Sequence, residues 1–262
     1  MHVGVHLSSL RIFLLIMASM TLMACSSVKQ DRITEINGTR FHFLAYGHGS
    51  PTVLFENGMA SSLDTWGSIP DSISKTTKVF AYDRAGIGRS DTISAERSIP
   101  NMVNELRDIL KKEHVRPPYI YVAHSMGSYL ARYFAAHYPD EIQAILLIDP
   151  SPDKMYDDYN EQEYREFKEF GDQSFLDASI GPKREWENYL DNRRYVRDAV
   201  ISDRIPMVII SATQWDFYDY HEGMINGNPY SKHLKEEGGH DLHQEKPQLI
   251  IDLIHQLLER SN

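Results

Sequence analysis

The chain has 262 residues, of which 42% are hydrophobic, and this is enough apolar material for one well-packed domain. Its formal net charge is −10 and no run of Lys or Arg stands out, which argues against a nucleic-acid partner. The single cysteine, Cys25, excludes an intramolecular disulfide.

The N-terminal segment has the pattern of a secretory signal peptide. Arg11 precedes an apolar run over residues 12–23, which is shorter than the roughly 20 apolar residues of a membrane-spanning helix. Residues 22–25, Leu-Met-Ala-Cys, resemble the bacterial lipobox, in which the cysteine is lipidated and becomes the mature N-terminus. A plain cleaved signal with an incidental cysteine is the alternative.

This resemblance implies a domain organisation and a location. We expect residues 1–24 to be a signal peptide, residues 25–31 a tether and residues 32–262 the folded domain. The residue after the cysteine is Ser26 rather than an aspartate. This resembles the sorting signal of lipoproteins that go to the outer membrane of Gram-negative bacteria. We therefore expect a protein of the bacterial cell envelope, held to the membrane by a lipid on Cys25 and facing the periplasm.

After the tether, strand-like and helix-like segments alternate. Residues 32–35 and 40–46 flank Asn37-Gly38, a strong signal for a β-hairpin. Apolar runs typical of strands buried on both faces of a parallel sheet follow at residues 52–55, 78–82, 119–123, 142–148 and 207–211. Apolar residues recur at helical spacing at 102–110, 130–137 and 249–257. The pattern predicts a three-layer α/β/α sandwich around a mostly parallel sheet.

Residues 151–204 interrupt this alternation. They contain no strand-like run, carry nine aromatic residues and supply −5 of the net charge. Five of the aromatic residues approximate one helical face: Tyr156, Tyr159, Tyr164, Phe167 and Phe170. Because open α/β sheets bind ligands at the carboxyl ends of their strands, we expect a helical cap that lines a pocket there. A long, well-packed crossover is the alternative.

Residues 123–127, Ala-His-Ser-Met-Gly, lie between a strand-like run and a helical stripe. This context is typical of a nucleophile elbow, a tight turn that presents a serine and needs small residues two positions before and after it. Ala123 stands in place of the more usual glycine, which is a mild steric departure. We therefore expect Ser125 to be a catalytic nucleophile, with a chance match as the alternative.

With this elbow the chain resembles the α/β-hydrolase superfamily. The similarity includes a Glu-x-Gly segment at residues 56–58 and an Asp-Arg-Ala-Gly-x-Gly segment at residues 83–88, and it covers nearly everything after residue 35. It implies an α/β-hydrolase fold and an oxyanion hole formed by the backbone N–H groups of Met59 and Met126. Each such donor typically contributes about 3 kcal/mol to transition-state stabilisation. The 83–88 segment is expected to be a structural loop without a catalytic role.

The resemblance also places the catalytic base. Gly238-Gly239-His240 precedes the C-terminal amphipathic stripe, where the family has its catalytic histidine. An imidazole there can deprotonate Ser125 and later protonate the leaving group. His243 is expected to pack at the start of the following helix instead.

The acid that would orient His240 is left open between two positions. Asp149 follows the run at 142–148 and Asp216 follows the run at 207–211, and family members place their acid after either strand. Asp216 falls about one residue later than usual, so we favour Asp149 and keep Asp216 as the alternative.

The predicted activity is hydrolysis of a small-molecule ester, or of an amide, through an acyl-enzyme on Ser125. One alternative is a peptidase of the proline-iminopeptidase kind, which would need acidic residues of the cap to hold a substrate amine. Another is a non-catalytic protein that binds a small molecule on the same fold. No cluster of His, Asp or Glu has the sequence spacing of metal ligands, so we expect neither a metal nor a cofactor.

Overall fold

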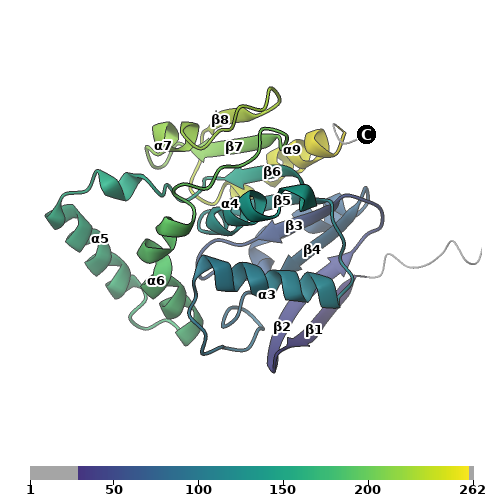
Figure 1. Cartoon of the computed structure of the whole chain (residues 1–262), viewed down its shortest axis with the longest axis horizontal. Helices are drawn as coiled ribbons and strands as arrows, with labels where there is room; N and C mark the ends of the chain where they lie inside the picture. The colour runs from purple at the N-terminus through teal and green to yellow at the C-terminus, as the bar shows by residue number, and fades with distance from the viewer. Residues whose placement is uncertain (1–28, 260–262) are drawn as a thin grey trace, which may run out of the picture.

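The computed structural model describes residues 29–259 (Figure 1). The predicted signal peptide and Cys25 lie outside these residues. The strands are β1 (Gln30–Ile36), β2 (Thr39–Tyr46), β3 (Thr52–Glu56), β4 (Lys78–Tyr82), β5 (Tyr119–His124), β6 (Ile142–Ile148), β7 (Met207–Ala212) and β8 (Lys232–Glu236). The α-helices are α2 (Ile69–Ile73), α3 (Ile99–Lys112), α4 (Gly127–His137), α5 (Glu161–Ser174), α6 (Ile180–Asn192), α7 (Tyr218–Glu222), α8 (Leu242–Glu245) and α9 (Pro247–Glu259). Short 3-10 helices are η1 (Leu63–Trp66), η2 (Pro139–Glu141), η3 (Met155–Asp157) and η4 (Arg193–Tyr195).

The strands form one mostly parallel sheet in the order β1-β2-β4-β3-β5-β6-β7-β8. Only the pairs β1–β2 and β2–β4 are antiparallel. Every strand predicted from the sequence is present, which confirms the predicted fold class. Strand β8, Lys-His-Leu-Lys-Glu, was missed because it pairs only with β7 at the edge of the sheet, where charged residues are favoured and no apolar run is needed.

The predicted hairpin is confirmed between β1 and β2. Asn37 and Gly38 both have positive φ, 50° and 82°, as the tight turn between twisted strands requires. The first strand already includes Gln30 and Asp31, which the sequence had placed in the tether.

Helices cover both faces of the sheet. In Figure 1, α3 and α4 lie in front of it, and their apolar stripes, which include Leu106 and Phe134, pack on Phe80 and Tyr121. Helices α2 and α9 cover the opposite face with side chains such as Ile73 and Ile254. Helix α9 begins at Pro247. Backbone N–H groups in the first turn of a helix have no intrahelical acceptor, so a proline, which has no N–H, costs no hydrogen bond there.

The segment between β6 and β7 holds α5 and α6, flanked by η3 and η4 (Figure 1). The prediction that five aromatic residues of this segment share one helical face is wrong. Asn160 caps α5 by accepting from the N–H groups of the second and third helical residues, so the helix begins at Glu161 and leaves Tyr156 and Tyr159 before it. On the helix itself, Phe170 is 72% exposed.

Within residues 29–259, none of the helices has both the length and the apolar character needed to cross a membrane.

Candidate active site

Ser125 lies at the turn between β5 and α4, as an elbow requires. Its φ is 50°, a left-handed conformation that costs a non-glycine residue about 1–2 kcal/mol and marks a constrained turn. Gly127 is needed two positions later, because a Cβ atom there would lie 2.6 Å from the carbonyl oxygen of Asn57. Ala123 fits in the fully buried end of β5, so the missing glycine does not disturb the turn.

His240 and Asp149 form a hydrogen-bonded pair beside the elbow. The Nδ1 atom of His240 lies 2.6 Å from Oδ2 of Asp149, and the aspartate side chain is 1% exposed. Of the two acids that the sequence left open, the structure therefore brings Asp149 to the histidine. Asp216 is exposed in the loop after β7 and, within residues 29–259, forms no hydrogen bond with His240. The ring centroid of its neighbour Trp215 lies 4.6 Å from that of the imidazole.

The backbone and its neighbours fix the orientation of Asp149. Its φ is 40°, and its second carboxylate oxygen accepts from the backbone N–H of Ala212 at 2.9 Å. Behind it, His221 lies 2.7 Å from both the carbonyl oxygen of Pro150 and the hydroxyl of Ser211. Burial lowers the pKa of His221 to about 4. The histidine of this support comes from α7, and no sequence motif indicated it.

The two backbone amides predicted for an oxyanion hole lie on either side of the elbow. Met126 follows Ser125 directly, and Met59 follows Gly58 in the loop after β3. Gly58 must be small, because a Cβ atom there would lie 2.8 Å from Nδ1 of His124. Within residues 29–259, neither amide donates to another group of the chain.

Three buried charged side chains lie directly behind this loop. Arg84 donates to Glu56 Oε1 at 2.8 Å and to Glu185 Oε1 at 2.6 Å, and all three side chains are at most 1% exposed. Burial raises the pKa of the Glu56 carboxyl, while Arg84 opposes that shift. Removing one partner of such a buried pair typically costs about 3–5 kcal/mol.

The sequence did not predict this cluster. Glu56 and Arg84 lie within the two motifs that carried the family resemblance, but the 83–88 segment was treated as a structural loop only. Glu185 lies on α6, 101 residues after Arg84, and nothing in its local sequence distinguishes it from the other acidic residues of the cap.

Histidines also pack beside the His240–Asp149 pair. His124 Nε2 lies 3.0 Å from the carbonyl oxygen of His240, so this ring nitrogen donates and holds the backbone of His240. Burial lowers the pKa of His124 well below its usual value and that of His243 to about 4, which keeps both rings neutral. As expected, His243 packs at the start of α8, against Trp66.

One group of side chains has the composition of a metal site. The ligand atoms of His124, Asp241 and His243 lie within 4.8 Å of one another. The sequence spacing did not reveal this group, because His124 belongs to a different element. Its His₂Asp composition is of a kind that zinc accepts.

A cavity of about 420 Å³ opens over Ser125 and His240. Its wall is strongly aromatic, with Tyr156, Phe167, Trp186 and Tyr189 from the cap segment and Trp215 and Phe217 from the loop after β7. The cap segment therefore lines the pocket. Within the described part of the chain, no Asp or Glu lines this cavity.

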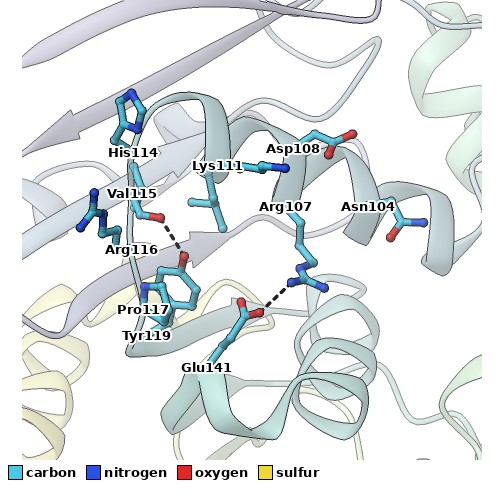
Figure 2. A pocket seen from close by; sticks show the side chains of 11 residues that line it. Asn104, Arg107, Asp108, Lys111, His114, Val115, Arg116, Pro117, Tyr119 and Glu141 are labelled. Carbon is cyan, nitrogen blue, oxygen red and sulfur yellow. Dashed lines mark hydrogen bonds and ion pairs between the residues drawn. The ribbon is translucent and has the colours of Figure 1, made fainter.

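A larger cavity, of about 740 Å³, lies at the other end of β5, beside the C-terminal half of α3 (Figure 2). Arg107 and Glu141 pair across it at 2.7 Å, and the hydroxyl of Tyr119 donates to the carbonyl of Val115. Of the described residues, those that line it include no serine or cysteine, so the smaller cavity is the candidate active site.

Comparisons with known proteins bear on the fold and the family of the chain. The chain is 24% identical over 244 residues to the uncharacterized protein YqjL of Bacillus subtilis, covering 86% of this chain and 90% of that protein. Its structure is similar to that of mouse alpha/beta hydrolase domain-containing protein 10, with a TM-score of 0.71 and 16% identity over 89% of this chain and 100% of that one. It is also similar to the enol-lactonase of Burkholderia xenovorans LB400, with a TM-score of 0.64 and 16% identity over 87% and 100% of the two chains. A family model of the alpha/beta hydrolase fold matches residues 51–222, and the chain therefore belongs to the α/β-hydrolase family.

Proposed function

We propose that the protein is a serine hydrolase that cleaves an ester, or less readily an amide, through an acyl-enzyme on Ser125. The observation that carries this proposal is the His240–Asp149 hydrogen bond of 2.6 Å at a cavity that Ser125 also lines. In this arrangement His240 removes the serine proton as the hydroxyl attacks the carbonyl carbon. Asp149 holds the imidazole in the tautomer whose Nε2 is free to accept that proton.

The remaining steps follow from the same residues. The carbonyl oxygen of the substrate becomes an oxyanion, which the amides of Met59 and Met126 stabilise. His240 then donates its proton to the leaving alcohol or amine, and the acyl group stays on Ser125. A water molecule, deprotonated by His240, attacks the acyl-enzyme and releases the carboxylic acid.

The cavity wall favours an uncharged acyl group, aliphatic or aromatic. Transferring a carboxylate into an aromatic, poorly hydrated pocket is costly unless a partner charge is present, and His240 is the only ionisable group other than tyrosine among the lining residues of the described chain. The same wall disfavours the proline-iminopeptidase alternative. That activity needs a carboxylate in the pocket to hold the substrate ammonium. The two buried acids of the cap segment, Asp153 and Glu185, are instead paired with Arg132 and Arg84.

Fluorophosphonate labelling tests the activity. We expect the purified domain to be labelled covalently, and mass spectrometry to place the adduct on Ser125. A series of p-nitrophenyl esters from acetyl to dodecanoyl then measures acyl preference. We expect an uncharged ester to exceed a succinyl ester of similar size by at least about tenfold in kcat/KM. An adduct on another residue, or a preference for the charged acyl group, contradicts the proposal.

We further propose that Cys25 carries a lipid anchor, as the lipobox-like sequence at residues 22–25 suggests. One acyl chain holds a protein only marginally at a membrane, so the several chains of a bacterial lipoprotein would supply the attachment. Cys25→Ser should therefore move the protein from the membrane pellet to the supernatant, with kcat/KM unchanged. Ser27→Ala, two residues further on, is the matched control and should stay in the pellet. Pelleting of the Cys25→Ser variant contradicts the anchor.

A further inference from the structure

Arg84 is saturated by acceptors from two parts of the fold, the segment 56–58 and helix α6. Its guanidinium has five N–H groups. Nε donates to Glu185, Nη1 donates to Glu56 and to the carbonyl oxygen of Asn57, and Nη2 donates to the carbonyl oxygen of Gly58 and to Glu185. All five donors are used, so the guanidinium has one defined position.

That position fixes the direction of the Met59 amide. The peptide bond between Gly58 and Met59 is trans, so its C=O and N–H groups point in opposite directions. Arg84 Nη2 lies 2.6 Å from the Gly58 oxygen and directs that oxygen toward the buried cluster. The Met59 N–H must then point away from the cluster.

Glu185 fixes the following peptide. Its Oε2 accepts from the backbone N–H of Ala60 at 2.8 Å, while its Oε1 accepts from Arg84. Ala60 has a φ of 60°, which an L-residue rarely adopts without support from its surroundings. One carboxylate of the cap therefore holds both the strained residue after Met59 and the arginine that orients the peptide before it.

Helix α6 is placed firmly enough to do this. Near its start Gly181 packs against Gly86, so closely that a Cβ atom on Gly181 would lie 2.0 Å from the Gly86 carbonyl oxygen. Glu185 lies one turn further along the same helix. The next residue, Trp186, lines the substrate cavity, so the helix that holds the loop also contacts bound substrate.

We propose that Glu185 is a positioning residue that aims the Met59 amide at the oxyanion, so that the cap and the oxyanion loop function as one unit. The inference rests on the proposed function, because it assigns Met59 to the transition state of that reaction. Glu185 itself touches no reacting atom and acts through Ala60 and Arg84.

Substitutions at Glu185 test this role. Loss of one oxyanion donor lowers kcat by about 10²–10³-fold, so we expect Glu185→Ala to lower kcat by about 100-fold with KM nearly unchanged. Glu185→Gln should lose less, because its amide oxygen can still accept from the Ala60 N–H. A boronic acid, which forms a charged tetrahedral adduct on the serine, should lose affinity in the same order of variants. Trp186→Ala should instead change KM and the preference for acyl chain length.

Glu187→Gln is the matched control, since Glu187 is an exposed residue of the same helix. Hydrogen exchange of the 56–61 peptide gives a second readout, which should accelerate in Glu185→Gln and not in the control. If the Ala variant fails to fold, the Gln variant decides. Unchanged kcat, boronate affinity and exchange in Glu185→Gln overturn the inference. An inactive wild-type protein overturns the proposed function instead, and the exchange readout still measures whether Glu185 holds the loop.

Discussion

Ser125→Ala should abolish covalent labelling and lower kcat by on the order of 10⁶-fold, as removal of the nucleophile does in a well-studied serine protease. The reason is that His240 would have no hydroxyl to deprotonate, and the remaining backbone donors cannot supply a nucleophile. Residual hydrolysis above that of water would come from the amides of Met59 and Met126. Steady-state kinetics on a p-nitrophenyl ester and fluorophosphonate labelling measure the two effects.

The same variant should fold normally. Among residues 29–259, the Ser125 hydroxyl has no hydrogen bond to lose, and alanine at a φ of 50° carries much the same backbone strain as serine. Ser128→Ala is a matched control on the next turn of the chain, because its buried hydroxyl has no partner in the described structure and removing it should be nearly neutral. Activity retained in Ser125→Ala at the wild-type level removes Ser125 as the nucleophile.

The sequence predicted those parts of the fold that local patterns encode. The runs that became β3 to β7 are apolar because both sheet faces are covered, and the stripe of α9 repeats at helical spacing because one side of it packs on the sheet. Strand β8 lacks such a pattern, since its place at the edge demands little burial. In the cap, periodicity alone suggested one long helical face, whereas the side chain of Asn160 starts α5 later.

Some residues of the candidate site could likewise be located from local sequence patterns, and others depend on tertiary contacts. Ser125 lies in an elbow whose constraints are local, and His240 follows a recognisable Gly-Gly turn, so both could be located from the sequence. The choice between Asp149 and Asp216 depends on which strand end faces the imidazole, and this is a tertiary relation. Glu185 is a further example, because its importance comes only from reaching Arg84, 101 residues away.

Asp149→Asn should lower kcat by about 10⁴-fold, the loss seen when the equivalent aspartate of a serine protease triad is changed to asparagine. The substitution suits the backbone, because asparagine tolerates the φ of 40° at this position better than most residues. The side-chain oxygen can still accept from the Ala212 N–H. The amide NH₂ then faces His240 Nδ1 and can only donate, so Nδ1 must become an acceptor. The imidazole proton moves to Nε2, the atom that should receive the serine proton.

Asp216→Asn is the matched comparison, and it should leave kcat within about twofold of the wild-type value. Asp216 is exposed, and a surface charge of this kind contributes little to stability, on the order of 0.5 kcal/mol. The unfolding midpoint separates a lost orienting acid from general damage, because a wrong tautomer lowers kcat while leaving that midpoint nearly unchanged. Near-normal kcat in Asp149→Asn beside an inactive Asp216→Asn would move the acid to the loop after β7. If neither variant loses more than about tenfold, His240 does not depend on an orienting carboxylate, and a reaction through the Ser125–His240–Asp149 triad is excluded.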